Sequence, residues 1–494
     1  MYEKKPIFAL TLPLLTEKWQ DEELNTRFNI ATKIHNAVLG TALRRYKEMI
    51  KTKEWRTNQL KLCEIKKISA QKGELKHLHD ERLRLIKQYK LSNFELEKVV
   101  KPMQHHFARS IDSHSSQKIA LRCWMSMEKL LFGTGEGVHF KKWYDGVKSI
   151  EAKDTSCISF KIKDKTIHWK GLLLKVATNE RNEYETEALT NGICFCRIKR
   201  RFIRGSFKYY VDIVLRGVPP LKHEIGSGTC GIDIGTQTVA YTTKSEAKLI
   251  ELADRVQSIE KEKRRLLRYM DRSKRKTNPE NFNKNGTLKK KLSKWQFSKR
   301  YLKARLILKD MYRKQADIRR MQHQMLANDI IKSANICYVE KMNFKGLQRR
   351  AKKTEISEKT GKFKRKKRFG KSLANKAPAM FITILSNKLK ARGGVLIEIN
   401  THLAKASQFN HLDQQYKKKK LCQRWNHLVY KDQPIKVQRD LYSAFLIKHI
   451  APDLSSFDQE GCEEDFDQFL THHSKEIERL SVKENLSSMG IKVA

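Results

Sequence analysis

Three acidic residues in separate parts of the chain could bind metal ions together: Asp233 in CGIDIGTQTV, Glu340 in ICYVEKMNFKGL and Asp440 in VQRDLYSAFL. Two divalent cations held by carboxylates, roughly 3.5–4 Å apart, can activate a water and stabilise the leaving oxygen in phosphodiester hydrolysis. Each motif alone is weak evidence, since an acid at a helix start is usually an N-cap. The three acids lie about a hundred residues apart, so only a fold can bring them together.

The surroundings of the three acids indicate which elements present them. Asp233 lies in an apolar run, where an unpaired buried acid costs free energy that a bound metal would offset. Glu340 ends a second apolar run, the position from which a strand delivers a side chain into a crevice. Asp440 precedes apolar residues at helical spacing, which predicts the first turn of a helix lying against the sheet.

The composition indicates a polyanionic partner. The chain of 494 residues has 103 Lys and Arg against 54 Asp and Glu, a formal net charge of +49 and a pI of about 9.9. Nucleic acid fits this charge better than a membrane, because we find no apolar run of about 18 residues. With 39% hydrophobic residues the chain can fill the cores of roughly two to four folded units.

The cysteines indicate a reducing compartment. Nine cysteines form no C-x-x-C pair, which argues against a disulfide framework and a ribbon-type zinc site. Residues 6–15 resemble a short signal core but no small-residue cleavage site follows, so we predict an opening β-strand there. We therefore expect a cytoplasmic protein.

The first half of the chain reads as a β-domain interrupted by helices. After the opening strand, apolar residues at three- and four-residue steps predict an amphipathic helix over 24–46, and further helix is predicted over 74–131. Alternating patterns over 158–162 and 207–213, with a run TIHWKGLLL between them, predict strands. A helical insertion into a β-barrel accounts for this order.

The second half reads as an α/β sheet. Residues 226–243 predict a strand, a turn and a second strand, and 246–334 carry a long helical pattern broken by SKRKTNPENFNKNG. The runs ICYVE and GVLIEIN are separated by a helical pattern, and strands interleaved with helices are typical of α/β sheets. The last 44 residues hold ten acids, which predicts either a short acidic helix or an acidic flap that competes with nucleic acid.

The three acidic motifs together resemble those of the RuvC nuclease domain in TnpB proteins and miniature type V-F CRISPR effectors. The likeness extends to LLRYMDRSKRKTNPENF after the first motif, and to ASQFNH and KKKKLCQRW before the third. It covers roughly residues 139–450, while the N-terminal helices agree in character only.

This resemblance implies a multidomain α+β fold, in which an N-terminal β-barrel with a helical insertion precedes an RNase H-like (RuvC) nuclease domain. The implied parts are a first wedge strand in 1–20, a helical recognition lobe in 21–138, the wedge β-domain in 139–222 and RuvC motifs I and II in 223–400. A degenerate target-nucleic-acid-binding loop would follow in 401–435, and motif III with an acidic tail in 436–494.

The resemblance also implies an activity and its partners. Asp233, Glu340 and Asp440 would ligate Mg²⁺, with Mn²⁺ as an alternative ion, and cut DNA as an RNA-guided endonuclease of a prokaryotic antiviral defence system. Pairing with a guide RNA would select the sequence, while the protein would hold the backbone and read a short adjacent motif in the double-stranded target. Members of the type V-F group place two copies on one guide RNA, so a homodimer is expected.

Basic residues extend the predicted nucleic-acid surface beyond the acids. The run 352–368 has nine Lys and Arg against two Glu, which suits a solvated loop or an arm that follows phosphates. Arg424 and Arg439 lie near the predicted centre and would contact either the scissile phosphate or RNA. The predicted contacts within the run are Lys352, Lys353, Lys364, Arg365, Lys366, Lys367 and Arg368.

One departure from the family concerns zinc. Most TnpB proteins carry a four-cysteine ribbon between motifs II and III, whereas this region offers only Cys422 with His402, His411 and His427. We therefore expect no structural zinc. The missing ribbon and the chain length favour a type V-F effector over a transposon-encoded TnpB.

Three other classes of protein stay open as alternatives. A guided DNA-binding repressor would keep the fold and cut poorly. A DDE-type strand transferase would share the nuclease scaffold, but we find no separate helix-turn-helix at the N-terminus. The last alternative is a basic RNA-binding structural protein.

Overall fold

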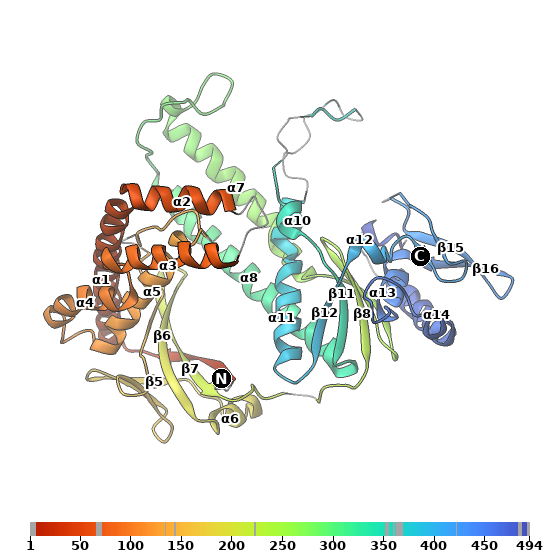
Figure 1. The fold of residues 1–494 in the computed structure, drawn as a ribbon, viewed down its shortest axis with the longest axis horizontal. Helices are drawn as coiled ribbons and strands as arrows, with labels where there is room; N and C mark the ends of the chain where they lie inside the picture. The colour runs from red at the N-terminus through yellow and green to blue at the C-terminus, as the bar shows by residue number, and fades with distance from the viewer. Residues whose placement is uncertain are drawn as a thin grey trace. The chain divides into compact units, whose positions relative to one another are not determined.

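The computed structural model describes residues 6–65, 72–133, 135–142, 145–221, 224–350, 355–358, 361, 369–420, 422–482 and 487–491. The chain divides into two compact units, Met1–Pro220 and Leu221–Ala494 (Figure 1). None of the helices in these ranges combines the length and apolar character needed to cross a bilayer.

The first unit is built on a seven-stranded antiparallel sheet with the order β2-β6-β7-β1-β5-β4-β3. The strands are β1 (Ile7–Leu15), β2 (Ser149–Glu151), β3 (Ile158–Lys161), β4 (Thr166–Trp169), β5 (Leu172–Val176), β6 (Ile193–Ile203) and β7 (Ser206–Arg216). The end strand β3 also contacts β6, so the sheet is nearly closed. The expected N-terminal barrel-like sheet is confirmed, with β1 paired between β5 and β7.

In the described part of the chain between β1 and β2, five helices follow β1. They are α1 (Lys18–Ile50), α2 (Lys53–Ile65), α3 (Lys72–Gln88), α4 (Asn93–His106) and α5 (Ser113–Leu131), and a short α6 (Glu183–Leu189) precedes β6. The predicted apolar stripe of α1 is buried, including Leu24, Phe28, Ala31 and Val38. The predicted helical insertion between strands of one sheet is therefore present.

The run TIHWKGLLL is a hairpin and not one strand. Lys170 and Gly171 have φ angles of 44° and 73° and connect β4 to β5. Two consecutive residues with positive φ are typical of a two-residue hairpin turn. The chain therefore reverses its direction in the middle of a stretch whose hydrophobic pattern is continuous.

The second unit contains a five-stranded mixed sheet with the order β10-β9-β8-β11-β12. Its strands are β8 (Thr229–Ile234), β9 (Thr238–Thr242), β10 (Ala247–Glu251), β11 (Ile336–Glu340) and β12 (Val395–Ile399). The pairs β8–β9 and β9–β10 are antiparallel, whereas β8–β11 and β11–β12 are parallel. The helix predicted over 246–334 is wrong at its start. Residues 247–251 form strand β10, which pairs with β9 before any helix begins.

Helices pack on this sheet in two groups. Buried residues of α8 (Lys299–Ser333) and α11 (Pro378–Lys390) form one core with β8 and β11, while α13 (Arg439–Lys448) and α14 (Gln459–Ser481) form another with β10. The acidic C-terminal segment lies on α14, whose Phe466, Phe469 and Glu476 are buried. Figure 1 shows α11 beside β12 and α13 beside β8.

The remaining elements connect these layers. They are η1 (Asp254–Val256), α7 (Gln257–Thr277), η2 (Pro279–Asn281), α9 (Phe344–Leu347), α10 (Gly370–Lys376), α12 (Thr401–Ala404), β13 (Phe409–Asn410), β14 (Gln415–Tyr416), β15 (Trp425–Tyr430), β16 (Gln433–Gln438) and η3 (Ser487–Met489). Helices α7 and α8 contact each other along a hairpin. The predicted break SKRKTNPENFNKNG (273–286) overlaps the segment 278–298 that joins them, but α7 continues through Thr277 and α8 begins only at Lys299.

Candidate active site

Two of the three acids lie on neighbouring parallel strands. Asp233 is in β8, and Glu340 is the last residue of β11. In the register of these strands Ile232 is the partner of Val339. The next residues are Asp233 and Glu340, and residues at equal register on parallel strands face the same side of a sheet. The two strands therefore present both carboxylates together.

Asp440 reaches these strands on helix α13. The N-cap of this helix is Gln438, whose side-chain oxygen accepts a hydrogen bond of 2.8 Å from the Leu441 amide. Asp440 is the second helical residue and does not cap the helix, so its carboxylate is available for another role. The helix packs on β8, β9 and β11, and Gly231 of β8 lets its backbone approach the strand directly.

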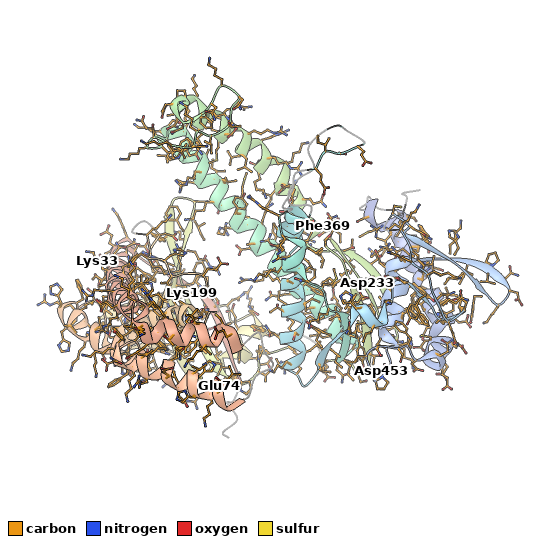
Figure 2. All side chains as sticks on the ribbon, turned by 45° about the horizontal axis from the view of Figure 1, so that its top comes forward. Lys33, Glu74, Lys199, Asp233, Phe369 and Asp453 are labelled. Atoms are coloured by element: carbon orange, nitrogen blue, oxygen red, sulfur yellow. The ribbon has the colours of Figure 1, made fainter. Side chains whose placement is uncertain are left out.

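A cavity of about 590 Å³ joins the three motifs. Its walls include the carboxylates Asp233, Glu340 and Asp440, the cations Lys418, Lys419, Arg424 and Arg439, and the side chains of Met342, Phe369, Gln408 and Ser488. Figure 2 labels Asp233 and Phe369, two of these wall residues, in the second unit. The cavity therefore holds oxygen ligands for cations as well as groups that can bind a phosphate.

A larger cavity of about 740 Å³ lies beside the edge strand β10, between α8 and α14. Acids and bases are mixed in its walls, as with Glu246, Asp329, Lys332 and Arg479. None of the three predicted acids lines it. The smaller cavity is therefore the candidate active site.

Burial and mutual repulsion shift the pKa values of the acids in this site. Burial raises the pKa of the Asp233 carboxyl well above its usual range, and the charges of Asp440 and Glu340 raise it further. Burial raises the pKa of Glu340 to about 7. Acids gathered in a buried site favour protonation or a bound cation over a set of bare negative charges.

The third acid is paired with arginines. Arg439 Nη2 lies 3.0 Å from Asp440 Oδ1, and Arg424 Nη1 lies 3.8 Å from Asp440 Oδ2. Among the described residues, no side-chain hydrogen bond contributes to the pKa shifts of Asp233 and Glu340, although the charges of Arg439 and Arg424 lower the pKa of Asp233. Within the same residues, Asp440 is the acid of the site that has close ion-pair partners.

The residue types fit magnesium, because all three side chains offer carboxylate oxygens. In the arrangement found here, no three His, Cys, Asp or Glu side chains within the described ranges lie close enough to hold an ion. The Asp440 carboxylate faces Arg439 instead. Sharing ions among all three acids therefore requires these side chains to move closer to one another.

The predicted nucleic-acid contacts divide into two groups. Arg424 and Arg439 line the candidate active site, together with the three acids. The predicted contacts Lys352, Lys353, Lys364, Arg365, Lys366, Lys367 and Arg368 lie outside the described residues. Their role stays a prediction.

Several wall residues were not predicted. Lys418 and Lys419 belong to the KKKK run that carried part of the family resemblance, and this run was the signal that could have identified them. Burial and the nearby Arg439 charge lower the pKa of Lys419. Phe369 and Ser488 had no local signal, since they reach the cavity only through the fold.

Comparisons with known proteins find distant likenesses. No family model and no curated protein matches the chain. Among solved structures, the chain is similar to a Cas12f1–sgRNA–target DNA complex, with a TM-score of 0.47 and 11% identity over 88% of this chain and 84% of that chain. It is also similar to a CRISPR–Cas12f ternary complex, with a TM-score of 0.26 and 11% identity over 88% and 82% of the two chains.

A Cas12i–crRNA–dsDNA complex is a further likeness, with a TM-score of 0.24 and 9% identity over 92% of this chain and 64% of that chain. These names fall in the CRISPR effector group that the sequence resembles. Because the identities are 11% or less and the TM-scores lie below 0.5, we base the proposed function on the site residues.

Proposed function

We propose that the protein is an RNA-guided DNA endonuclease that hydrolyses phosphodiester bonds in a single RuvC-type site. The observation that carries this proposal is the convergence of Asp233, Glu340 and Asp440, from three distant segments, on one cavity that also holds four cations. The mixed sheet, with two of the acids on its adjacent strands β8 and β11, supports the RNase H-like fold that the resemblance implies.

The site residues divide the chemistry between them. Bound Mg²⁺ would supply an activated water and a positive charge near the leaving oxygen. Asp233 and Glu340 would hold the ions from the sheet, and Asp440 would hold them from the facing helix. Arg439, released from Asp440, and Arg424 would bind the scissile phosphate and orient it towards the acids.

The hairpin of α7 and α8 supports a polyanionic partner. Residues 257–333 contain 24 Lys and Arg against seven Asp and Glu. The loop at its end is held by buried asparagines: Asn278 exchanges hydrogen bonds of 2.8 and 2.7 Å with the Gln296 backbone, and Asn281 exchanges bonds of 3.2 and 2.6 Å with the Ser293 backbone. An ordered basic arm of this kind suits the phosphates of a guide RNA.

The finer assignments follow from the resemblance. The protein would be a miniature type V-F CRISPR effector in the prokaryotic cytoplasm, with a transposon-encoded TnpB nuclease as the alternative origin. The first unit would contain the wedge and recognition parts and read a short motif beside the target. Two copies would assemble on one guide RNA.

A guided DNA-binding protein with little cleavage is a second candidate. The Arg439–Asp440 ion pair favours this candidate, because the third acid of the site already has a positively charged partner that competes with a metal ion. An exchange of Arg439 for metal distinguishes the nuclease from this alternative, since only the nuclease needs it.

Co-purification with RNA tests the proposal. The protein is expressed with its native flanking DNA, the bound RNA is sequenced, and matching double-stranded DNA is incubated with the complex, with and without Mg²⁺. We expect a defined RNA and magnesium-dependent cutting of DNA that matches it. A defined RNA with guided DNA binding but no cutting supports the second candidate, and the absence of a defined RNA contradicts both.

A further inference from the structure

A short segment near the C-terminus, Ser487–Ile491, packs against the third motif, and we call it the C-terminal strap. Its Met489 and Ile491 are buried in the core around α13 and α14. Ser488 lines the candidate active site, and its buried hydroxyl has no hydrogen-bond partner among the described residues. The strap therefore forms part of the wall of the cavity.

The strap holds the residue that begins helix α13. Gln438 is fully buried and uses both ends of its amide: Oε1 accepts from the Leu441 amide at 2.8 Å, and Nε2 donates to the Met489 carbonyl oxygen at 3.1 Å. The backbone amide of Gln438 also donates to His473 Nε2 at 3.0 Å. One side chain thus joins the strap to the first turn of the helix that carries Asp440.

The strap also contacts the segment that carries Arg424. The indole Nε1 of Trp425 donates a hydrogen bond of 2.8 Å to the Gly490 carbonyl oxygen. Gly490 has a φ of 74°, and a Cβ built on it would lie 2.3 Å from the Cβ of Arg424. Only glycine suits this position, because any larger residue would be strained and would displace Arg424.

The contacts of the C-terminal strap act on both partners of the Arg424–Asp440 ion pair. Arg424 faces Asp440, and its carbonyl oxygen accepts a hydrogen bond of 2.9 Å from the Arg439 amide. The strap supports Asp440 through Gln438, and it supports the arginines through Gly490 and Trp425. A displacement of the strap would therefore move an acid and two cations together.

We infer that the C-terminal strap positions the third motif, so that Gly490, Trp425 and Gln438 are positioning residues for Asp440 and its arginines. The functional part of this inference rests on the proposed nuclease function. Its structural part concerns the order of the first turn of α13 and can be measured without any activity.

The test uses full-length protein with Gly490→Ala and Trp425→Phe. The first variant pushes the strap away from Arg424. The second keeps an aromatic ring but removes the hydrogen bond to Gly490. The control is Val482→Ala, because Val482 is 71% exposed and lies just outside α14.

Hydrogen exchange is the first readout, measured on metal-free protein. We expect amides in the first turn of α13, including that of Leu441, to exchange at least tenfold faster in Gly490→Ala, with a smaller effect in Trp425→Phe and none in the control. The inference is overturned if both variants fold and the amides in the first turn of α13 exchange at the wild-type rate in each. If Gly490→Ala does not fold, the exchange rate in Trp425→Phe alone tests the inference.

Manganese affinity and DNA cleavage are the second readouts. We expect at least a fivefold loss of Mn²⁺ affinity by electron paramagnetic resonance and at least a tenfold slower cleavage step in Gly490→Ala, while guided DNA binding stays within twofold of wild type. Variants that keep wild-type Mn²⁺ affinity and cleavage contradict the positioning role. If the wild-type protein binds no Mn²⁺, the proposed nuclease function is contradicted. The hydrogen-exchange measurement then still tests whether the C-terminal strap orders the first turn of α13.

Discussion

Gly231 of β8 lies directly against Ala444 of α13. A Cβ built on Gly231 would be 2.1 Å from the Ala444 carbonyl oxygen and 2.2 Å from the Lys448 amide nitrogen. Both of these are backbone atoms, so no side-chain rotation can make room. This contact fixes the distance between the strand that carries Asp233 and the helix that carries Asp440.

Gly231→Ala should therefore destabilise the second unit. We expect a loss of about 3 kcal/mol in the free energy of unfolding. The new Cβ would clash with backbone atoms, and these cannot move aside as a side chain can by changing its rotamer. Urea denaturation measures this change. Gly235→Ala is the matched control, since its new Cβ would first meet the Thr238 hydroxyl oxygen at 3.3 Å, and equal stability of the two variants would contradict the close contact.

Two buried histidines should make the second unit sensitive to acid. Burial lowers the pKa of His411 and of His473 to about 4, whereas the unfolded value is about 6.5. Their contribution to stability is therefore complete above pH 6.5 and is lost as the pH falls towards 4, by at most about 1.4 kcal/mol per pH unit for each. The raised pKa values of Asp233 and Glu340 contribute in the opposite direction over the same range, so wild type is compared with His473→Gln, which keeps both acids. We expect the urea midpoint to fall further, or to rise less, between pH 7 and pH 5 in wild type than in His473→Gln. An equal change in the two proteins would contradict the prediction.

Arg439 should compete with divalent cations for Asp440. Removing it in Arg439→Gln abolishes a partly buried ion pair worth about 1 kcal/mol, so the Mn²⁺ affinity of nucleic-acid-free protein should rise about fivefold. Cleavage should fall about a hundredfold, because the phosphate loses a guanidinium. Arg424→Gln is the control for the first effect, because its guanidinium is farther from Asp440, at 3.8 Å against 3.0 Å. Unchanged Mn²⁺ affinity in Arg439→Gln would show that the pair does not oppose metal binding.

The loop between α7 and α8 should depend on its buried asparagines. Asn281→Ala leaves the Ser293 backbone without two hydrogen bonds, at a local cost of about 2 kcal/mol. We expect trypsin to cut the 282–298 segment several times faster, and the affinity for guide RNA to fall about fivefold. Asn285→Ala is the control, because Asn285 is exposed and bonds only within the loop. Wild-type proteolysis of Asn281→Ala would exclude this clamping role.

The secondary-structure positions of the three acids could be predicted from the sequence, because each lies in a local pattern. A strand end or a helix start is recognised within a few residues, and Asp233, Glu340 and Asp440 each have such a context. The short strand β10 was missed because its five residues adjoin a long helical pattern and pair only with β9. The strap could not be predicted either, because its hydrogen bonds to Gln438 and Trp425 come from the backbone carbonyl oxygens of Met489 and Gly490, and a backbone group leaves no signal in the sequence.

Single-turnover cleavage of guide-matched DNA tests the central claim most directly, with Asp233→Ala, Glu340→Ala and Asp440→Ala compared with wild type at saturating Mg²⁺. If the three acids form one site, each variant should lose at least about a thousandfold in the cleavage rate and keep guided DNA binding. Any one variant that cuts at a rate near that of wild type would contradict a nuclease site shared by these three residues.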